Sequence, residues 1–246
     1  MSAIIESSKF KHTAFITVFG LLVACGVHAQ PGPTEYSAEY AAAYKGRNVG
    51  TSRFSLSRDP ATGRYVYISD TRAKGLLRMA APNPAIDRSE FTLREGRIVP
   101  LTFRHEDGSR KGDDNHTIEF DWDRHEAQIL GANGSHSVAL EDGMLDRGSL
   151  QVALMYDLSR GLEPSSYTTV DDDSTTTYEF TFEGRKTVDS ELGPIEVLTY
   201  VQQREDSSRR TIIELAPALG YVPVRIEQFR DGESRSAFVI QSLDRD

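Results

Sequence analysis

Apolar and polar residues alternate with a period of two over most of the chain after residue 35. This period places every second side chain on one face, so it predicts β-strands that bury one face and expose the other. Turn sequences rich in Gly, Pro, Asn and Asp separate these segments, and Asn133-Gly134 is a strong hairpin signal. The predicted strands cover residues 36–40, 49–56, 65–69, 90–93, 98–105, 116–122, 126–130, 177–182, 195–203, 209–215, 221–229 and 235–243, with breaks at Gly184, Gly193-Pro194 and Asp231-Gly232.

Strands that follow one another through short turns favour an antiparallel meander. A sheet with this many strands has to curl or close, because its edges would otherwise stay free to pair with other chains. We therefore expect a mainly β protein, with a strongly curved antiparallel sheet or barrel-like meander and one main α-helix.

The helix is predicted over about 146–160, where apolar residues are spaced three and four positions apart. Asp146 is a suitable N-cap, Gly161 is a suitable C′ residue, and Pro164 prevents the helix from continuing. Such a helix can fill or cap a curved sheet. Its apolar residues are Leu150, Leu154, Met155 and Leu158.

Residues 74–88 show neither the period of two that predicts a strand nor the spacing of three and four that predicts a helix. Leu76, Leu77 and Met79 precede a stretch, 80–84, that contains two alanines and two prolines and is poorly suited to helix or strand. We expect a loop there that lies across an opening of the sheet.

Residues 14–24 are uncharged and mostly apolar; they follow the basic residues Lys9 and Lys11 and precede Val27-His28-Ala29. A basic start, a short apolar run and an Ala-x-Ala-like end are typical of a secretory signal, and the run is too short to span a membrane. We expect a signal peptide over 1–29, a short tether over 30–34 and a single β-rich domain over 35–246. The expected location is the periplasm.

The same segment allows an alternative. Leu22-Val23-Ala24-Cys25 fits a bacterial lipobox, in which the cysteine is acylated and anchors the protein in a membrane. Cys25 is the only cysteine of the chain, so no intramolecular disulfide can form. On this alternative the protein is a lipoprotein held through Cys25.

The formal net charge is −9 at pH 7, from 28 Lys and Arg against 37 Asp and Glu. This net charge argues against a nucleic-acid partner and against electrostatic docking on anionic lipid. After residue 29, no apolar run approaches the roughly 20 residues that a spanning helix needs. We expect neither a nucleic-acid partner nor a transmembrane helix after signal removal.

A set of short motifs extends over nearly the whole chain after residue 35. The first half carries Tyr36-x-Ala38-x-Tyr40, Thr71-x-Ala73-Lys74-Gly75, Gly96-x-Ile98-x-Pro100 and Phe120-Asp121-Trp122. The second half carries Ser149-Leu150-Gln151, Leu192-Gly193, and Ala216-Pro217 followed by Tyr221-Val222-Pro223-Val224-Arg225-Ile226. The set resembles a family of Gram-negative periplasmic proteins of unknown function, which implies a curved β-sheet or open barrel and no established activity. Glu214-Leu215 stands where members often carry an aromatic residue, so no role of that aromatic is carried over.

Acidic residues and histidines gather between Asp113 and Glu126. Asp114 and His116 on one strand face would offer oxygen and nitrogen ligands to a divalent ion, but no compact spacing such as His-x-x-x-His is present, and solvated turns explain the composition. A serine hydrolase would carry a Gly-x-Ser-x-Gly motif, and the chain has none. We predict no metal site, no cofactor and no catalytic residue, and keep a hydrolase without recognisable motif as an alternative.

A curved sheet with aromatic residues on its inner face can enclose an apolar cavity. Tyr178, Phe180 and Phe182 would line it, while Arg225 at the rim would face an anionic head group or pair with an acid on a neighbouring strand. The leading hypothesis is a non-enzymatic binding module for an apolar or amphiphilic envelope ligand. The same aromatic residues can equally fill a packed core. The alternative is an envelope assembly or interaction protein that offers an edge strand to a partner and binds no small molecule.

Overall fold

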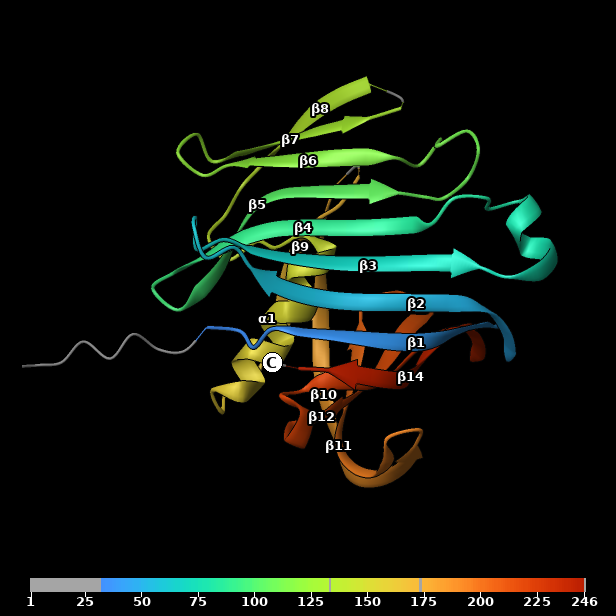
Figure 1. The fold of residues 1–246 in the computed structure, drawn as a ribbon. Helices are drawn as coiled ribbons and strands as arrows, with labels where there is room; N and C mark the ends of the chain where they lie inside the picture. Colours follow the sequence, from blue (N-terminus) through green and yellow to red (C-terminus); the bar gives the residue numbers. More distant parts are fainter. Residues whose placement is uncertain (1–31, 133, 173, 246) are drawn as a thin grey trace, which may run out of the picture. The chain divides into compact units, whose positions relative to one another are not determined.

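Fourteen strands form one antiparallel sheet in the computed structural model, which describes residues 32–132, 134–172 and 174–245 (Figure 1). The order of strands across the sheet is β8-β7-β6-β5-β4-β3-β2-β1-β14-β13-β12-β11-β10-β9. The expected mainly β fold with a strongly curved, barrel-like sheet and one main helix is confirmed. The expected signal peptide over 1–29, Cys25 and part of the expected tether over 30–34 lie outside the described residues.

The strands are β1 (Tyr36–Tyr44), β2 (Arg47–Arg58), β3 (Tyr65–Ala73), β4 (Ala85–Arg94), β5 (Arg97–Glu106), β6 (His116–Asp121), β7 (Glu126–Gly131), β8 (Gly134–Ala139), β9 (Ser166–Val170), β10 (Thr175–Ser190), β11 (Gly193–Gln203), β12 (Arg209–Ala216), β13 (Val222–Arg230) and β14 (Glu233–Asp244). The helix α1 (Arg147–Ser159) connects β8 to β9, and two 3-10 helices, η1 (Gly75–Met79) and η2 (Pro217–Leu219), lie in connections. Within the two halves, β1 to β8 and β9 to β14, each strand therefore pairs with its neighbour in sequence, as a meander does.

The pairing of β1 with β14 joins the two halves of the meander and leaves β8 and β9 as the edges. The segment that precedes α1 lies along β9: Leu145 N donates to Thr168 O at 3.0 Å, and Val170 N donates to Leu145 O at 2.8 Å. This parallel bridge covers part of the β9 edge. The sheet is thereby nearly closed.

Alternation along the strands decides which side chains face the interior. In β1, Tyr36, Ala38 and Tyr40 are buried while Glu39 is exposed, as the period-two pattern predicts. The Tyr40 hydroxyl donates to the Pro223 carbonyl oxygen at 2.8 Å, so its one polar group is satisfied inside the core.

The helix begins and ends where the sequence predicts. Its N-cap is Asp146, and the side chains of Asp146 and Ser149 each accept from the other's backbone N–H, which forms a capping box. Leu150, Leu154 and the other apolar residues of α1 are buried, and α1 packs against β3, β4, β5 and β9. The helix therefore fills part of the space that the curved sheet encloses.

Two clusters of buried side chains make up the core. The larger contains residues of α1 together with inward-facing residues of strands from both halves of the sheet. The smaller lies between β5 to β9 and the segment before α1, and includes Phe103, Ile118, Ile129 and Leu140. Inward-facing aromatic residues such as Tyr40 belong to the first cluster, where they contact other apolar side chains.

The observed elements differ from the expected ones in three respects. β4 begins at Ala85, so the expected loop over 74–88 is limited to 74–84 and contains η1. Gly184 does not end a strand: it lies at a β-bulge with φ of +127°, and β10 continues to Ser190. The strands β8 and β9 are absent from the predicted set, because edge strands that bury few side chains show no clear alternation.

Candidate functional site

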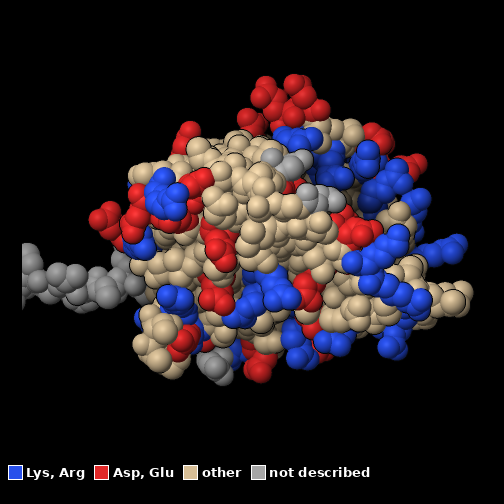
Figure 2. All heavy atoms as spheres, turned by 90° about the horizontal axis from the view of Figure 1, so that it is seen from above, with Lys and Arg blue, Asp and Glu red and all other residues tan. Residues whose placement is uncertain are grey.

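Charge is distributed unevenly over the surface of this acidic protein. Figure 2 shows Lys and Arg side chains gathered toward the side that lies on the right in Figure 1, where η1 connects β3 to β4. The net charge is therefore a poor guide to what individual surfaces of the molecule bind.

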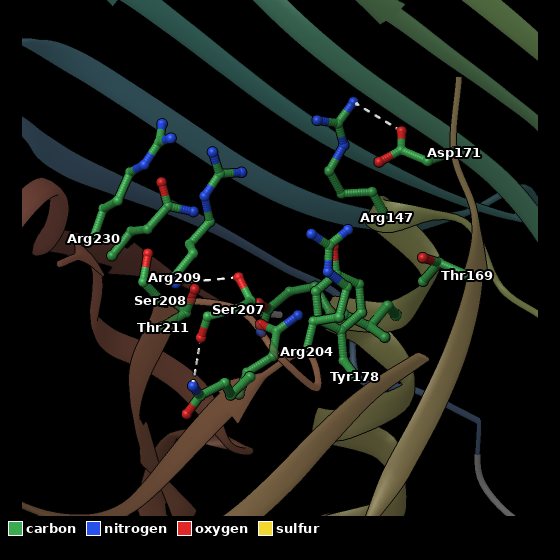
Figure 3. Close-up of a pocket in the computed structure, with 15 residues that line it drawn as sticks. Arg147, Thr169, Asp171, Tyr178, Arg204, Ser207, Ser208, Arg209, Thr211 and Arg230 are labelled. Carbon is green, nitrogen blue, oxygen red and sulfur yellow. Dashed lines mark hydrogen bonds and ion pairs between the residues drawn. The ribbon is translucent and has the colours of Figure 1, made fainter. Parts of the chain in front are cut away.

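A cleft of about 440 Å³ opens at the same end of the sheet, between the first turn of α1 and the adjoining ends of β9 to β13 (Figure 3). Most of its lining is polar. The lining residues are Arg147, Leu150, Gln151, Thr169, Asp171, Tyr178, Gln202, Gln203, Arg204, Ser207, Ser208, Arg209, Thr211, Gln228 and Arg230.

Four of these residues are arginines and only Asp171 is acidic. Arg209 begins β12 and Arg230 ends β13, and the register of the two strands places them directly opposite each other. Side chains in directly opposite positions project from the same face of a sheet, so the two guanidinium groups lie on the same side. The cleft thus has a concentration of positive charge.

The loop that carries Arg204 is held by hydrogen bonds within the hairpin of β11 and β12. Gln203 Nε2 donates to Ser207 O at 2.7 Å, and Arg209 N donates to Ser207 Oγ at 3.2 Å. These bonds fix the backbone on both sides of the turn, so the backbone positions of Arg204 and Arg209 are held before a ligand binds.

Arg147 is held on the opposite wall by acidic and aromatic neighbours. Its Nη2 atom lies 3.7 Å from Asp87 Oδ1 and 4.0 Å from Asp171 Oδ1, and its guanidinium carbon lies 5.5 Å from the centre of the Phe103 ring. Asp87 Oδ1 also lies 2.6 Å from His105 Nδ1. Arg147 is therefore shared between two carboxylates, and a bound anion would compete with them for it.

Two buried nitrogen atoms near this wall have no hydrogen-bond partner among the described residues, His116 Nε2 and Gln151 Nε2. Gln151 lines the cleft, and His116 Nε2 lies 4.0 Å from Asp171 Oδ1. A buried donor without an acceptor is costly, so the Gln151 amide is an unsatisfied group beside the cleft.

Tyr178 lies between the arginines of the hairpin and α1, with its ring directed into the cleft (Figure 3). Burial is the main cause that raises the pKa of its hydroxyl, while the nearby Arg147, Arg204 and Arg209 act in the opposite direction. The hydroxyl is therefore neutral at physiological pH and available as a hydrogen-bond donor.

Asp146 lies directly before Arg147 and is fully buried. Its carboxylate accepts hydrogen bonds from Gly148 N and Ser149 N, both at 2.8 Å, and from Ser89 Oγ at 2.7 Å. Burial raises the pKa of this carboxyl to about 6, although the hydrogen bonds act against that rise. The cap that positions Arg147 thus contains a titratable group.

The ligand-binding residues predicted from sequence do not all come together. Tyr178 lines the arginine cleft, whereas Arg225 lines a second cleft with Lys186 and Glu214. Arg225 pairs with Glu227 of its own strand, Nη2 to Oε2 at 2.7 Å, and not with an acid of a neighbouring strand.

Phe180 and Phe182 lie in different environments. Phe180 is 6% exposed in the core and packs edge-on against Tyr167, whereas Phe182 is 49% exposed beside Tyr200. The four arginines of the cleft are not predicted from the sequence, because the register of β12 with β13 and the docking of α1 bring them together.

The acidic segment 113–126 consists of the strand β6, the turns on either side of it and the first residue of β7. Asp113, Asp114 and His116 line a separate surface cleft, and Asp121 Oδ1 accepts from Arg124 N in the tight turn that follows β6. In the part of the chain that the structure describes, no group of three or more His, Cys, Asp or Glu is placed to hold a metal ion.

The chain belongs to the DUF3108 family of proteins of unknown function, whose model matches residues 36–238. The match confirms the resemblance that the sequence motifs indicate, to an uncharacterised family with a curved sheet. No curated protein is significantly similar in sequence. The family assignment therefore defines a class of protein without an assigned activity.

Similar folds occur among solved structures. A β-barrel-like protein of the DUF1849 domain from Brucella abortus matches with a TM-score of 0.51 at 10% identity, over 87% of this chain and 99% of that chain. MucB matches with a TM-score of 0.37 at 10% identity, over 86% of this chain and 53% of MucB. A protein with a YmcC-like fold from Bacteroides fragilis has a TM-score of 0.38 at 9% identity, over 87% of this chain and 98% of that chain. The first likeness shows a shared fold and nothing about function.

None of the helices in the described ranges combines the length and the apolar character that crossing a membrane requires.

Proposed function

We propose that this protein is a non-enzymatic binding protein whose arginine-lined cleft takes the anionic group of a ligand, a phosphate or a carboxylate. The observation that carries the proposal is the direct cross-strand pairing of Arg209 with Arg230. Like charges in directly opposite positions of a sheet destabilise it. A bound anion between the two guanidinium groups would offset that repulsion.

The other lining groups support the same chemistry. Arg204 and Arg209 form no ion pair among the described residues, so their N–H donors are free to bind an oxyanion in a forked geometry. The Tyr178 hydroxyl adds a neutral donor. All of these groups donate hydrogen bonds, as the oxygen atoms of a phosphate or carboxylate require.

The cleft suits the polar end of an amphiphilic ligand better than its apolar end. Tyr40, Phe54 and Phe180, which an enclosed acyl chain would contact, belong to the core that α1 helps to fill. We therefore locate the anionic group of an amphiphile, or a small polar anion, in the arginine cleft and not inside the sheet.

Titration calorimetry with inorganic phosphate and with a short alkyl phosphate at low salt tests this proposal. We expect Arg209→Gln and Arg230→Gln each to weaken binding by about tenfold or more, since a charged hydrogen bond contributes about 1.5–3 kcal/mol. Arg210→Gln is the matched control: it removes the same charge from the next position of β12, where Arg210 stacks on Phe229 and lines no part of the cleft.

The ligand-free variants provide a second measurement. Removing either member of the Arg209–Arg230 pair relieves repulsion, so the thermal midpoint without ligand should rise slightly, whereas that of Arg210→Gln should not. Equal binding by the wild type and both cleft variants would contradict the proposal.

We also propose that the protein is exported to the cell envelope. The support is the basic, apolar and small-residue pattern of residues 1–29, with cleavage after Ala29 and release into the periplasm. Anchoring through an acylated Cys25 is the alternative on the same segment.

A second candidate function rests on the edge strand β8. Its residues are nearly all exposed, and within the described residues it pairs with β7 alone. The free N–H and C=O groups on its other side can accept a strand from a partner protein. If the anions do not bind and an envelope protein protects the β8 amides from hydrogen exchange, this interaction role replaces the cleft proposal.

A further inference from the structure

The connection between β3 and β4 displays apolar side chains to solvent. Leu76 is 85% exposed, Met79 is 72% exposed and Leu77 is 46% exposed, and η1 has no buried residue. In Figure 1 this connection projects beyond the ends of β3 and β4. Single exposed apolar residues are common, but three within four positions on one projecting turn need an explanation.

The same connection carries positive charge without any acidic residue. Between residues 74 and 84 the charged residues are Lys74 and Arg78, in a chain with a net charge of −9. Neither forms an ion pair with another described residue. Basic side chains therefore flank the apolar tip, and no carboxylate within the connection neutralises them.

Backbone hydrogen bonds hold both ends of the connection. Lys74 N donates to Val49 O at 2.7 Å, Ala81 N donates to Leu77 O at 2.9 Å, and Asn83 N donates to Gly108 O at 3.2 Å. The apolar side chains are thus presented on an anchored turn, and less conformational freedom is lost when they bind.

We propose that η1 is a membrane-docking element, which inserts Leu76, Leu77 and Met79 into the interface of an anionic lipid bilayer. A bilayer interface accepts apolar side chains at the depth of the headgroups while basic residues contact anionic lipid. The proposal stands on the connection alone and does not depend on the arginine cleft.

The shape and charge of the tip favour a bilayer over other occupants. A stable protein interface buries about 800 Å² on each partner, whereas a convex tip with three apolar side chains offers much less. Two copies docking tip to tip would bring the four basic side chains of Lys74 and Arg78 together, which repel. An anionic bilayer is deformable, so it can take up a small apolar tip, and its negative charge attracts the basic side chains of the tip.

Vesicle sedimentation tests the proposal, with phosphatidylcholine vesicles compared against phosphatidylcholine vesicles that contain one third phosphatidylglycerol. Every protein carries Cys25→Ser, so that no acyl chain contributes to binding. We expect binding to the anionic vesicles to exceed binding to the neutral ones by at least tenfold, since each basic residue near the surface adds about fivefold.

Two double variants separate the contributions of the apolar and the basic side chains to vesicle binding. Leu76→Ser with Met79→Ser should reduce binding to anionic vesicles about a hundredfold, because each inserted side chain contributes about tenfold. Lys74→Gln with Arg78→Gln should reduce it to the level seen with neutral vesicles. Leu192→Ser, an exposed leucine (38%) in the turn after β10, is the control and should bind like the wild type.

Wild-type protein that does not sediment with anionic vesicles overturns the proposal. So does unchanged binding by the Leu76→Ser and Met79→Ser double variant when its circular dichroism shows a native fold. If the double variant instead converts a dimer to a monomer in size-exclusion chromatography, the tip is a contact between copies and the membrane proposal is wrong.

Discussion

Two opposing effects act on the pKa of the Asp146 carboxyl. As the N-cap of α1 it accepts backbone hydrogen bonds from Gly148 and Ser149, which favour the ionised carboxylate. Its burial has the larger effect and favours the neutral acid, so its pKa rises to about 6. The residue beside it, Arg147, lines the cleft, so the cap lies next to the candidate site.

The raised pKa of Asp146 predicts a specific dependence of stability on pH. The folded state binds more protons than the unfolded state between the unfolded pKa of about 4 and the folded pKa of about 6. The stabilising contribution of the protonated group is therefore complete below about pH 4 and is lost as the pH rises through 6. A shift of about two pKa units corresponds to a loss of about 3 kcal/mol.

Urea unfolding of the wild type and Asp146→Asn at pH 4, 5, 6 and 7 measures this effect. Asparagine keeps the N-cap acceptor but does not titrate, so the wild type should lose stability relative to the variant as the pH rises. All other acids are common to both proteins and cancel in the comparison. A difference that stays constant over the whole range would show that Asp146 does not titrate there.

At the scale of elements, local patterns predict the interior of the fold better than its edges. The helix and the central strands follow from periodicity, caps and turns, which act between residues close in sequence. The edge strand β8 reads Gly-Ser-His-Ser-Val-Ala and is exposed on both faces, so it has no alternation to detect. At Gly184 the sequence suggests a break, but pairing with β11 carries β10 through a bulge.

The helix offers a test at this scale. Leu154 lies in the middle of α1 and is buried in the core, so Leu154→Pro removes a helical hydrogen bond and introduces a steric clash. We expect a loss of about 3 kcal/mol or more in the free energy of unfolding in urea. Leu154→Met, which conserves volume, should cost less than about 1.5 kcal/mol. Similar stabilities of the two variants would mean that α1 contributes little to the fold.

At the scale of the whole molecule, long-range pairings determine the architecture. The pairing of β1 with β14 connects strands at opposite ends of the described chain, and Leu145 covers part of the β9 edge. Both arrangements place connections that are far apart in sequence at one end of the sheet. The arginine cleft and η1 both lie toward that end of the strands.

The proposed export concerns the whole chain and is tested by its intact mass. Cleavage after Ala29 should give a mature protein that begins at Gln30, because Val27-His28-Ala29 matches a signal-peptidase site. A mass that corresponds to an acylated chain starting at Cys25, lost on Cys25→Ser, would establish the lipoprotein alternative.

The sequence by itself determined the β class, most central strands, the helix over 146–160 and the family resemblance. These features follow from periodicity and short motifs, which are properties of neighbouring residues. The sequence predicts Tyr178 as a ligand-binding residue, and the structure places it among the arginines of the cleft.

The cleft itself was decided by the tertiary structure alone. Arg147 comes from a helix, Arg204 from a turn and Arg209 and Arg230 from two strands, and no local pattern relates them. Only the register of β12 with β13 sets Arg209 opposite Arg230, and only the docking of α1 brings Arg147 to the same opening. Register and docking are fixed by the burial of apolar faces across the whole sheet, so charges that are unremarkable in sequence become a site when the sheet closes.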